Sequence, residues 1–341
     1  MAKQHDVIIV GGGPAGLTAG LYAARSKLNA VILERGMPGG QLLNTKDIED
    51  YPGFEHVGGF ELAERMTRHA EKFGCEIVTE TVTRVVRDPA AEDPWRAWVV
   101  ETESGARYVA PAVILAAGGT PYKLGVPGEE EYAGRGVSYC AVCDGAFFEG
   151  ETIAVVGGGD AAAEEADFLT RYAEKVYLIH RRSELRAQKV IQERVFRNER
   201  IEPVWDTVVK RIEGDARGVM RLVLQGTRTP DGEYVPEGTG PTRELGVTGV
   251  FVFIGFAPNT GLVGEHVEHD AGGYFTTDWR MQTSLPGLFA VGDVRSQLVR
   301  QITTAVGDAT TAAIAVERYL TELKEHRPVA GVSGELREKY G

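Results

Sequence analysis

The chain has 341 residues, a formal net charge of −12, 25% charged residues and 43% hydrophobic residues. This length predicts about two domains, each large enough to bury a core. The negative charge disfavours nucleic acid or an anionic membrane surface as a partner. No segment resembles a signal peptide, and none is long and apolar enough to span a bilayer, so we expect a cytoplasmic protein with no membrane partner.

The first expected nucleotide site lies at the start of the chain. An apolar strand over residues 7–10 leads into the glycine-rich loop 11–16, a helical stretch runs through Arg25, and a second strand over residues 30–33 ends at Glu34. A strand, glycine turn, helix and strand that ends at an acid form the context of a dinucleotide-binding fingerprint, which disfavours a merely tight turn. Pyrophosphate can approach the helix N-terminus, and the carboxylate suits a ribose hydroxyl.

A second copy of this unit surrounds the loop 157–162. Here His180 lies 23 residues after the first glycine of its loop, the separation that Glu34 has in the first copy, and Arg181, Arg182 and Arg186 follow. Arginines bind a 2′-phosphate through charged, forked hydrogen bonds, whereas a carboxylate would repel it. The first site therefore predicts a ligand with a free ribose and the second predicts NADP(H). The alternative for the arginines is a solvated basic helix start.

The cysteines indicate redox chemistry. Cys140 and Cys143 form a C-x-x-C pair followed at once by Asp144, and Cys75 stands alone as an ordinary small residue at a helix–strand junction. Three cysteines are too few for a disulfide scaffold, and no second Cys or His pair completes a zinc site, so we expect no metal. The pair predicts a redox-active dithiol. Asp144 is placed to act as its acid/base, or alternatively to open a turn.

The remaining segments repeat one plan. A helix over residues 58–73, a small β-meander over residues 76–101 and 107–110, and a buried strand over residues 113–118 follow the first unit. A parallel series from about residue 126 to 252 carries the thiol pair, the second loop, another meander and a strand. A long helix is expected over about residues 301–323.

The predicted fold class is α/β, with two Rossmann-like dinucleotide-binding domains of the two-dinucleotide-binding flavoprotein type, each with a small β-meander. The chain returns at Gly255 to complete the first domain, so the second domain is inserted into the first. The expected domains are residues 1–125 with 255–330, residues 126–254 with the thiol pair, and a tail over residues 331–341. Two linkers between the domains make a hinge.

Several motifs occur together, at residues 11–16, 39–42, 140–145, 157–162, 180–182, 186, 291–294 and 300–301. With them, the chain resembles the low-molecular-weight thioredoxin reductases of bacteria from end to end. Two departures are small: residues 116–119 read Ala-Ala-Gly-Gly where the family usually has Ala-Thr-Gly-Ala, and Asp50 stands where Asn is usual. These departures concern flavin contacts and not the activity.

The resemblance implies FAD in the first site, NADPH in the second, a homodimer, and thioredoxin as the partner. It also implies that Cys143 lies against the flavin, that Cys140 attacks the partner disulfide and that Asp144 moves the proton. The residues implied to bind FAD are Gly11, Gly13, Pro14, Ala15, Gly16, Glu34, Arg35, Gly39, Gly40, Gln41, Leu42, Asn44, Val82, Gly118, Gly292, Asp293, Arg300, Gln301 and Ile302. Those implied to bind NADPH are Gly157, Gly158, Gly159, Asp160, Ala161, His180, Arg181, Arg182, Arg186, Ile254 and Gly255.

The position of the thiols separates this chain from related classes. Glutathione- and lipoamide-type reductases carry the pair just after the first glycine loop, and residues 36–44 contain no cysteine. With the thiols in the NADPH domain, we expect one domain to rotate against the other. Three alternatives stay open: another small redoxin or dithiol substrate, a variant fed by ferredoxin or a deazaflavin, and a non-catalytic flavin redox sensor. The arginine cluster disfavours the second, and the intact second loop disfavours the third.

Overall fold

The structure is a computed structural model that describes residues 2–45, 47–88, 97–229, 232–236, 239–263 and 266–325. The chain divides into two compact units, unit 1 (Met1–Thr120 with Pro258–Gly341) and unit 2 (Pro121–Ala257). The second domain expected from the sequence, residues 126–254, lies within unit 2, and the expected tail, residues 331–341, lies outside the described residues.

Unit 1 is built on a five-stranded parallel sheet with strand order β21-β10-β2-β3-β6. In chain order its strands are β2 (Val7–Val10), β3 (Ala30–Glu34), β6 (Glu76–Thr79), β10 (Ala112–Leu115) and β21 (Leu288–Ala290). The central strands are unbroken runs of buried apolar residues, because layers cover the sheet on both faces.

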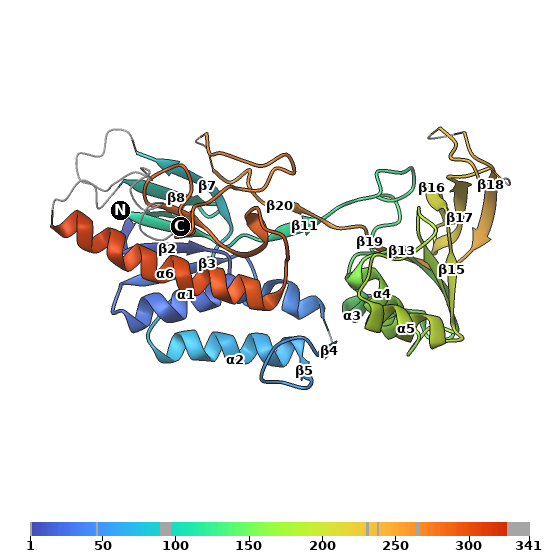
Figure 1. Ribbon diagram of the computed structural model, residues 1–341, viewed down its shortest axis with the longest axis horizontal. Helices are drawn as coiled ribbons and strands as arrows, with labels where there is room; N and C mark the ends of the chain where they lie inside the picture. The colour runs from blue at the N-terminus through green and yellow to red at the C-terminus, as the bar shows by residue number, and fades with distance from the viewer. Residues whose placement is uncertain are drawn as a thin grey trace. The chain divides into compact units, whose positions relative to one another are not determined.

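Helices form one of these layers and a second sheet forms the other. Figure 1 shows α1 (Pro14–Arg25) between α6 (Ile302–Lys324) and α2 (Gly59–Lys72). The other layer is the meander of β7 (Val82–Arg87), β8 (Trp98–Thr102) and β9 (Arg107–Ala110), to which β1 (Lys3–Gln4) pairs. Alternate residues of β2 enter the two cores: Ile9 packs with the helices, and Ile8 packs with Trp98 and Tyr108 of the meander.

Unit 2 repeats the three layers. Its parallel sheet has the order β12-β19-β13-β14-β15, with β12 (Val137–Ser138), β19 (Gly249–Phe253), β13 (Thr152–Gly157), β14 (Lys175–Ile179) and β15 (Ile201–Val204). Within this unit, α4 (Asp160–Leu169) and α5 (Lys189–Arg197) pack on one face. The meander of β16 (Thr207–Asp215), β17 (Gly218–Gly226) and β18 (Thr242–Gly246) packs on the other face (Figure 1).

Short elements complete the chain. The two connections between the units pair with each other as the strands β11 (Gly119–Pro121) and β20 (Phe256–Pro258). The remaining short elements are η1 (Gly40–Asn44), β4 (Asp47–Ile48), β5 (Val57–Gly58), α3 (Ala141–Asp144), η3 (Gly145–Phe148) and η4 (Gly292–Val294). None of the helices that the structure describes has the length and apolar character needed to cross a membrane.

The α/β class with two Rossmann-like domains is confirmed, and one element was assigned to the wrong sheet. The sequence places residues 76–79 in the meander, but β6 pairs in parallel with β3, from Val31 beside Glu76 to Glu34 beside Thr79. The expectation fails because β6 is an edge strand. Its four residues run exposed, half-buried, half-buried, exposed, so it lacks the unbroken buried run that marks the central strands of the parallel sheet.

Candidate active site

The first glycine loop is closely packed against the strands that it joins. Gly11 has a φ of +103°, and a Cβ there would clash with the carbonyl of Ala116, just after β10. A Cβ at Gly16 would clash in turn with the carbonyl of Gly11. Only glycine fits either position, and the chain therefore turns tightly from β2 into α1.

Glu34 holds this loop in place. The Gly12 N–H donates to its Oε2 at 2.6 Å, and the Gly36 N–H donates to its Oε1 at 3.0 Å. At the start of α1, Gly13 is extended and provides no side-chain cap, and Pro14 is the first helical residue. The N–H groups of the first turn, which includes Ala15 and Gly16, are thus left for an anion.

Two other segments meet the start of α1. The Gly39 N–H donates to the Gly12 carbonyl at 2.8 Å, just before η1 with Gly40, Gln41, Leu42 and Asn44. A Cβ on Gly292 would lie 3.1 Å from that of Ala15. Three distant stretches of sequence therefore converge at one helix end.

The other expected FAD residues lie in the same unit but farther along its elements. Asp293 is mostly buried, and this burial raises the pKa of its carboxyl group while the charge of Arg300 opposes the rise. Gln301 caps α6, and Ile302 begins it. Arg35 is exposed directly after β3, Val82 begins β7, and Gly118 follows β10 with a φ of +57°.

The second glycine loop has the same frame. A Cβ on Gly157 would clash with the carbonyl of Phe253 at the end of β19. Gly159 is extended with no side-chain cap and has open space around it. The first turn of α4 follows with Asp160, whose Oδ1 accepts the Gln188 N–H at 2.7 Å, and with the exposed Ala161.

The His180 side chain packs against this loop at Gly158. Its ring occupies the space that a Cβ on Gly158 would need, and the residue is 5% exposed. Burial, and after it the charge of Arg186, lowers the pKa of His180, so its imidazole is neutral at pH 7. Its Nε2 has no hydrogen-bond partner in the structure.

Three arginines lie close enough to His180 for their charges to add to the effect of burial and lower its pKa. Arg181, Arg182 and Arg186 are exposed, and no ion pair between the described residues involves their side chains. The Arg186 N–H donates to the Gly158 carbonyl at 2.7 Å, which fixes its backbone against the loop. Three unpaired cations thus stand beside a helix N-terminus, an arrangement suited to a phosphate. Ile254 and Gly255 follow β19 in the same unit.

Cys140 and Cys143 form a disulfide in unit 2, with their Cα atoms 5.4 Å apart. Cys140 is the N-cap of α3, and its Sγ accepts the Cys143 N–H at 3.2 Å. Ser138 fixes the preceding backbone, because its Oγ accepts the Cys140 N–H at 3.1 Å. Cys140 is half-buried and Cys143 is exposed. The sequence did not single out Ser138, although a serine two residues before the pair is a visible signal.

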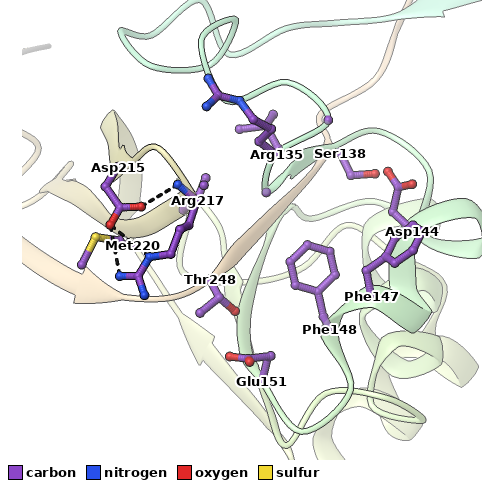
Figure 2. A pocket seen from close by; sticks show the side chains of 15 residues that line it. Arg135, Ser138, Asp144, Phe147, Phe148, Glu151, Asp215, Arg217, Met220 and Thr248 are labelled. Carbon is purple, nitrogen blue, oxygen red and sulfur yellow. Dashed lines mark hydrogen bonds and ion pairs between the residues drawn. The ribbon is translucent and has the colours of Figure 1, made fainter.

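A hollow of about 640 Å³ lies in unit 2, and its lining includes Ser138 and Asp144, which flank the cysteine pair in sequence. Figure 2 shows Asp144 and Phe147 on one side of it, with Arg217 and its hydrogen-bonded neighbour Asp215 on another, and Arg135 also lines it. Phe147 is 81% exposed, which is unusual for a phenylalanine. This lining is not visible in the sequence, because it is assembled from segments up to about a hundred residues apart.

The third cysteine is separate from this chemistry. Cys75 is 4% exposed in the helical core of unit 1, and burial raises the pKa of its thiol to about 12. It is therefore unreactive as a thiolate at neutral pH. Among the residues that the structure describes, no group of three or more His, Cys, Asp or Glu side chains is placed to hold a metal ion.

Comparisons with known proteins agree with this geometry. Residues 5–309 match the family model of pyridine nucleotide-disulphide oxidoreductases. The chain is 44% identical to the thioredoxin reductase of Bacillus subtilis over 95% of this chain and 97% of that one. The thioredoxin reductase structure from Lactococcus lactis is 43% identical, covers 94% of this chain and all of its own, and superimposes with a TM-score of 0.86. That from T. acidophilum is 31% identical, covers 94% and 99%, and has a TM-score of 0.83. The chain belongs to the pyridine nucleotide-disulphide oxidoreductases and, within them, to the thioredoxin reductases.

Proposed function

We propose that the chain passes electrons from NADPH to the Cys140–Cys143 disulfide and from there to oxidised thioredoxin. Bound FAD supplies the two-electron chemistry between the nicotinamide and the disulfide. The observation that carries this proposal is a disulfide in the same unit as a glycine loop with three unpaired arginines. Family membership supports the same reading.

The residues of unit 1 fit FAD. A flavin dinucleotide needs a close approach to a helix N-terminus for its pyrophosphate, and the uncapped start of α1 at Gly13 offers one. Glu34 stands at the end of β3, where a carboxylate can accept a ribose hydroxyl. Its oxygens already hold the Gly12 and Gly36 N–H groups, so the acceptor is fixed before a ligand arrives. The other proposed FAD contacts come from two segments, Gly39–Asn44 and Asp293 to Ile302.

The residues of unit 2 fit NADPH. The start of α4 repeats the uncapped helix end, and Arg181, Arg182 and Arg186 supply the positive charge that a 2′-phosphate needs. His180 is neutral and buried, so it acts by supporting Gly158 and not by adding charge. NADH has no phosphate at this position and would leave the arginines without a ligand.

The dithiol step follows from the chemistry of the pair. In the reduced chain, the Cys140 thiolate attacks one sulfur of the partner disulfide; a mixed disulfide forms and the other partner sulfur leaves as a thiolate that takes up a proton. The Cys143 thiolate then attacks Cys140 Sγ, which re-forms the internal disulfide and releases the reduced partner. The N–H that Cys143 donates to Cys140 Sγ stabilises a negative sulfur there, which favours Cys140 as the attacking thiolate. Residue exposure alone would favour Cys143.

Asp144 and the hollow beside it serve this exchange. We assign Asp144 the transfer of protons to and from the thiols, because it adjoins Cys143 and lines a space open to a partner. Phe147 offers an exposed apolar contact on the same wall. A partner disulfide that reaches the pair would therefore meet both a proton carrier and an apolar anchor.

The expected homodimer, cytoplasmic location and absence of nucleic-acid binding are proposals on the same footing. The family resemblance implies the dimer, so light scattering coupled to size exclusion should give twice the chain mass of 37.0 kDa. A particle with the mass of one chain would contradict it.

Oxidation of NADPH with and without a thioredoxin from the same source tests the activity. We expect slow oxidation by the protein alone and rapid oxidation once oxidised thioredoxin is added. Turnover with another small redoxin but not with thioredoxin would support the alternative dithiol substrate. An absence of turnover with every disulfide offered would favour the redox sensor.

Non-reducing electrophoresis tests the division of labour between the two thiols. The partner is a thioredoxin that lacks its resolving cysteine and is activated at the other. Cys143→Ser should trap it as a mixed disulfide, because no neighbouring thiolate resolves the bond to Cys140. Cys140→Ser should trap little. The reverse pattern would exchange the two roles, and trapping by neither would contradict the dithiol mechanism.

A further inference from the structure

Glu129 is a buried acid of unit 2 that the dithiol chemistry does not use. It is 1% exposed, and a buried carboxylate is costly unless hydrogen bonds compensate for the lost water. Its Oε1 accepts the Leu124 N–H and the Tyr139 hydroxyl, each at 2.8 Å, and its Oε2 accepts the Gly125 N–H at 2.7 Å. The donors in these hydrogen bonds are all neutral groups. The nearby cation is Lys123, whose pKa is raised first by the hydrogen bond to its own ion-pair partner and then by the Glu129 charge.

These donors come from two places with different roles. Leu124 and Gly125 stand where the first connection between the units, β11, has just led the chain into unit 2. Tyr139 is the residue directly before Cys140. One carboxylate thus joins the end of the connection to the segment that carries the disulfide.

The surrounding contacts make this link short and stiff. Leu124 and Tyr139 pack against the same core, on the meander face of the unit 2 sheet. Ser138 ties Cys140 on the other side, since its Oγ accepts the Cys140 N–H at 3.1 Å and donates to the Cys140 carbonyl at 3.2 Å. Where Tyr139 lies therefore sets where the backbone of Cys140 lies.

The Tyr139 hydroxyl can donate its hydrogen bond to Glu129 at every pH in the neutral range. Burial, together with the neighbouring Glu129 carboxylate, raises the pKa of the Tyr139 hydroxyl, which remains a donor throughout the neutral range. The adjacent acid makes a useful contrast. Glu130 forms an exposed ion pair with Lys123 at 2.9 Å, with 82% of its side chain accessible, and such pairs contribute little.

We propose that Glu129 and Tyr139 are a positioning pair, through which the end of the first connection and the backbone of Cys140 are held as one body. Thiol–disulfide exchange needs the attacking sulfur aligned with the bond that it breaks, and small errors of placement reduce the rate strongly. If unit 2 rotates about its two connections during the cycle, Cys140 moves together with the end of the first connection, because the pair holds the two segments in a fixed relation. This inference rests on the proposed role of the Cys140–Cys143 disulfide.

Two substitutions separate the two halves of this pair. We call the bonds from the Leu124 and Gly125 N–H groups to Glu129 the anchor, and the bond from the Tyr139 hydroxyl to Glu129 the link. Glu129→Gln replaces one acceptor oxygen with an NH₂ donor, so Gln cannot accept the Leu124 and Gly125 N–H groups and the tyrosine as the carboxylate does. Tyr139→Phe keeps the ring in the core and cuts only the bond to Glu129. Glu130→Gln and Tyr177→Phe are the matched controls, because Glu130 is exposed and Tyr177 lies in β14 with no hydrogen bond from its hydroxyl among the described contacts.

Amide hydrogen exchange measures the anchor without any turnover. In Glu129→Gln, the amides of Leu124 and Gly125 should exchange about tenfold faster or more, because a hydrogen bond to a buried charge is lost. The amide of Tyr132, which donates to the Gly128 carbonyl at 3.0 Å, serves as an internal reference and should change less. Equal exchange in Glu129→Gln and Glu130→Gln would overturn the anchor.

Steady-state and single-turnover kinetics of the FAD-loaded protein measure the link. We expect Tyr139→Phe to lower kcat with thioredoxin about three- to tenfold, with KM for thioredoxin and the rate of flavin reduction by NADPH within about twofold of the Tyr177→Phe control. A kcat equal to that control would overturn the link, and an equal loss in flavin reduction would show general damage and overturn it too. A wild-type chain that fails to reduce thioredoxin would instead refute the proposed function, and the exchange experiment would still report on Glu129.

Discussion

The two glycine loops share one backbone frame and differ in the residue that supports it. Gly11 and Gly157 each lie against the carbonyl of a neighbouring strand segment, at Ala116 and Phe253. Gly13 and Gly159 each precede a helix with no side-chain cap. The same fold therefore builds the same anion site twice, once in each unit.

The difference lies beneath the second glycine of each loop. Gly12 rests on the Glu34 carboxylate, and Gly158 rests on the neutral ring of His180 with three arginines nearby. The frame fixes where a pyrophosphate can lie, while the end of the second strand decides the charge that the adjoining ribose meets. A duplicated fold thus acquires two ligand preferences through a few residues.

The largest expected effect comes from the third glycine of the fingerprint, which only the first loop keeps. In Gly16→Ala the new Cβ would clash with the Gly11 carbonyl, whereas the second loop already holds Ala162 at this place. We expect Gly16→Ala to lower the free energy of unfolding by about 3 kcal/mol or more and to abolish flavin retention. Ala162→Gly should cost only about 1 kcal/mol.

Chemical denaturation and the flavin content of the purified variants check this contrast. If Gly16→Ala lowers the free energy of unfolding by no more than Ala162→Gly does and still retains flavin, the first loop tolerates the methyl group and the proposed difference in packing is wrong.

The next effect concerns the arginines. Arg181→Ala should weaken NADPH about ten- to a hundredfold, because a charged hydrogen bond contributes about 1.5–3 kcal/mol, and it should leave NADH almost unchanged. Arg197→Ala is the control, since Arg197 is an exposed arginine of the same unit that pairs with Glu193 on α5. KM for both cofactors is the measurement. An equal loss for NADPH and NADH in Arg181→Ala would refute the phosphate assignment.

The smallest effect is a pH dependence that only the second loop should show. Burial lowers the pKa of His180 below its ordinary 6.5, so the unfolded chain binds a proton first as the pH falls. The free energy of unfolding should therefore decrease as the pH falls through about 6.5. His180→Gln should remove that part of the slope. A slope unchanged in the variant would show that His180 is not held neutral.

Much of this fold could be predicted from the sequence because local pattern and tertiary role agree. Buried runs such as Val7–Val10, glycine turns and the amphipathic helix α2 are each specified by their own residues. The edge strand β6 could not be assigned to its sheet, since its four exposed and half-buried residues carry no buried run that would mark the parallel sheet. Its place depends on a crossover through α2 and not on its own residues.

The candidate site divides in the same way. The two cysteines are close to each other in sequence, and so are the three arginines, so spacing alone indicates each group. The Glu129–Tyr139 bond could not be predicted, because an acid in the run Glu129, Glu130 and Glu131 reads as a solvated charge cluster, and only burial distinguishes the first of them. The lining of the hollow was also out of reach, since it depends on how the meander of unit 2 folds back.

The most direct test of electron flow to the disulfide is a thiol map after reduction by NADPH. The FAD-loaded protein is treated anaerobically with excess NADPH and then alkylated, and the modified cysteines are identified by mass spectrometry. Cys140 and Cys143 should both be alkylated, while Cys75 stays unmodified because it is buried and its thiol pKa is raised to about 12. A Cys140–Cys143 bond that stays intact after the flavin has been reduced would contradict the proposed path.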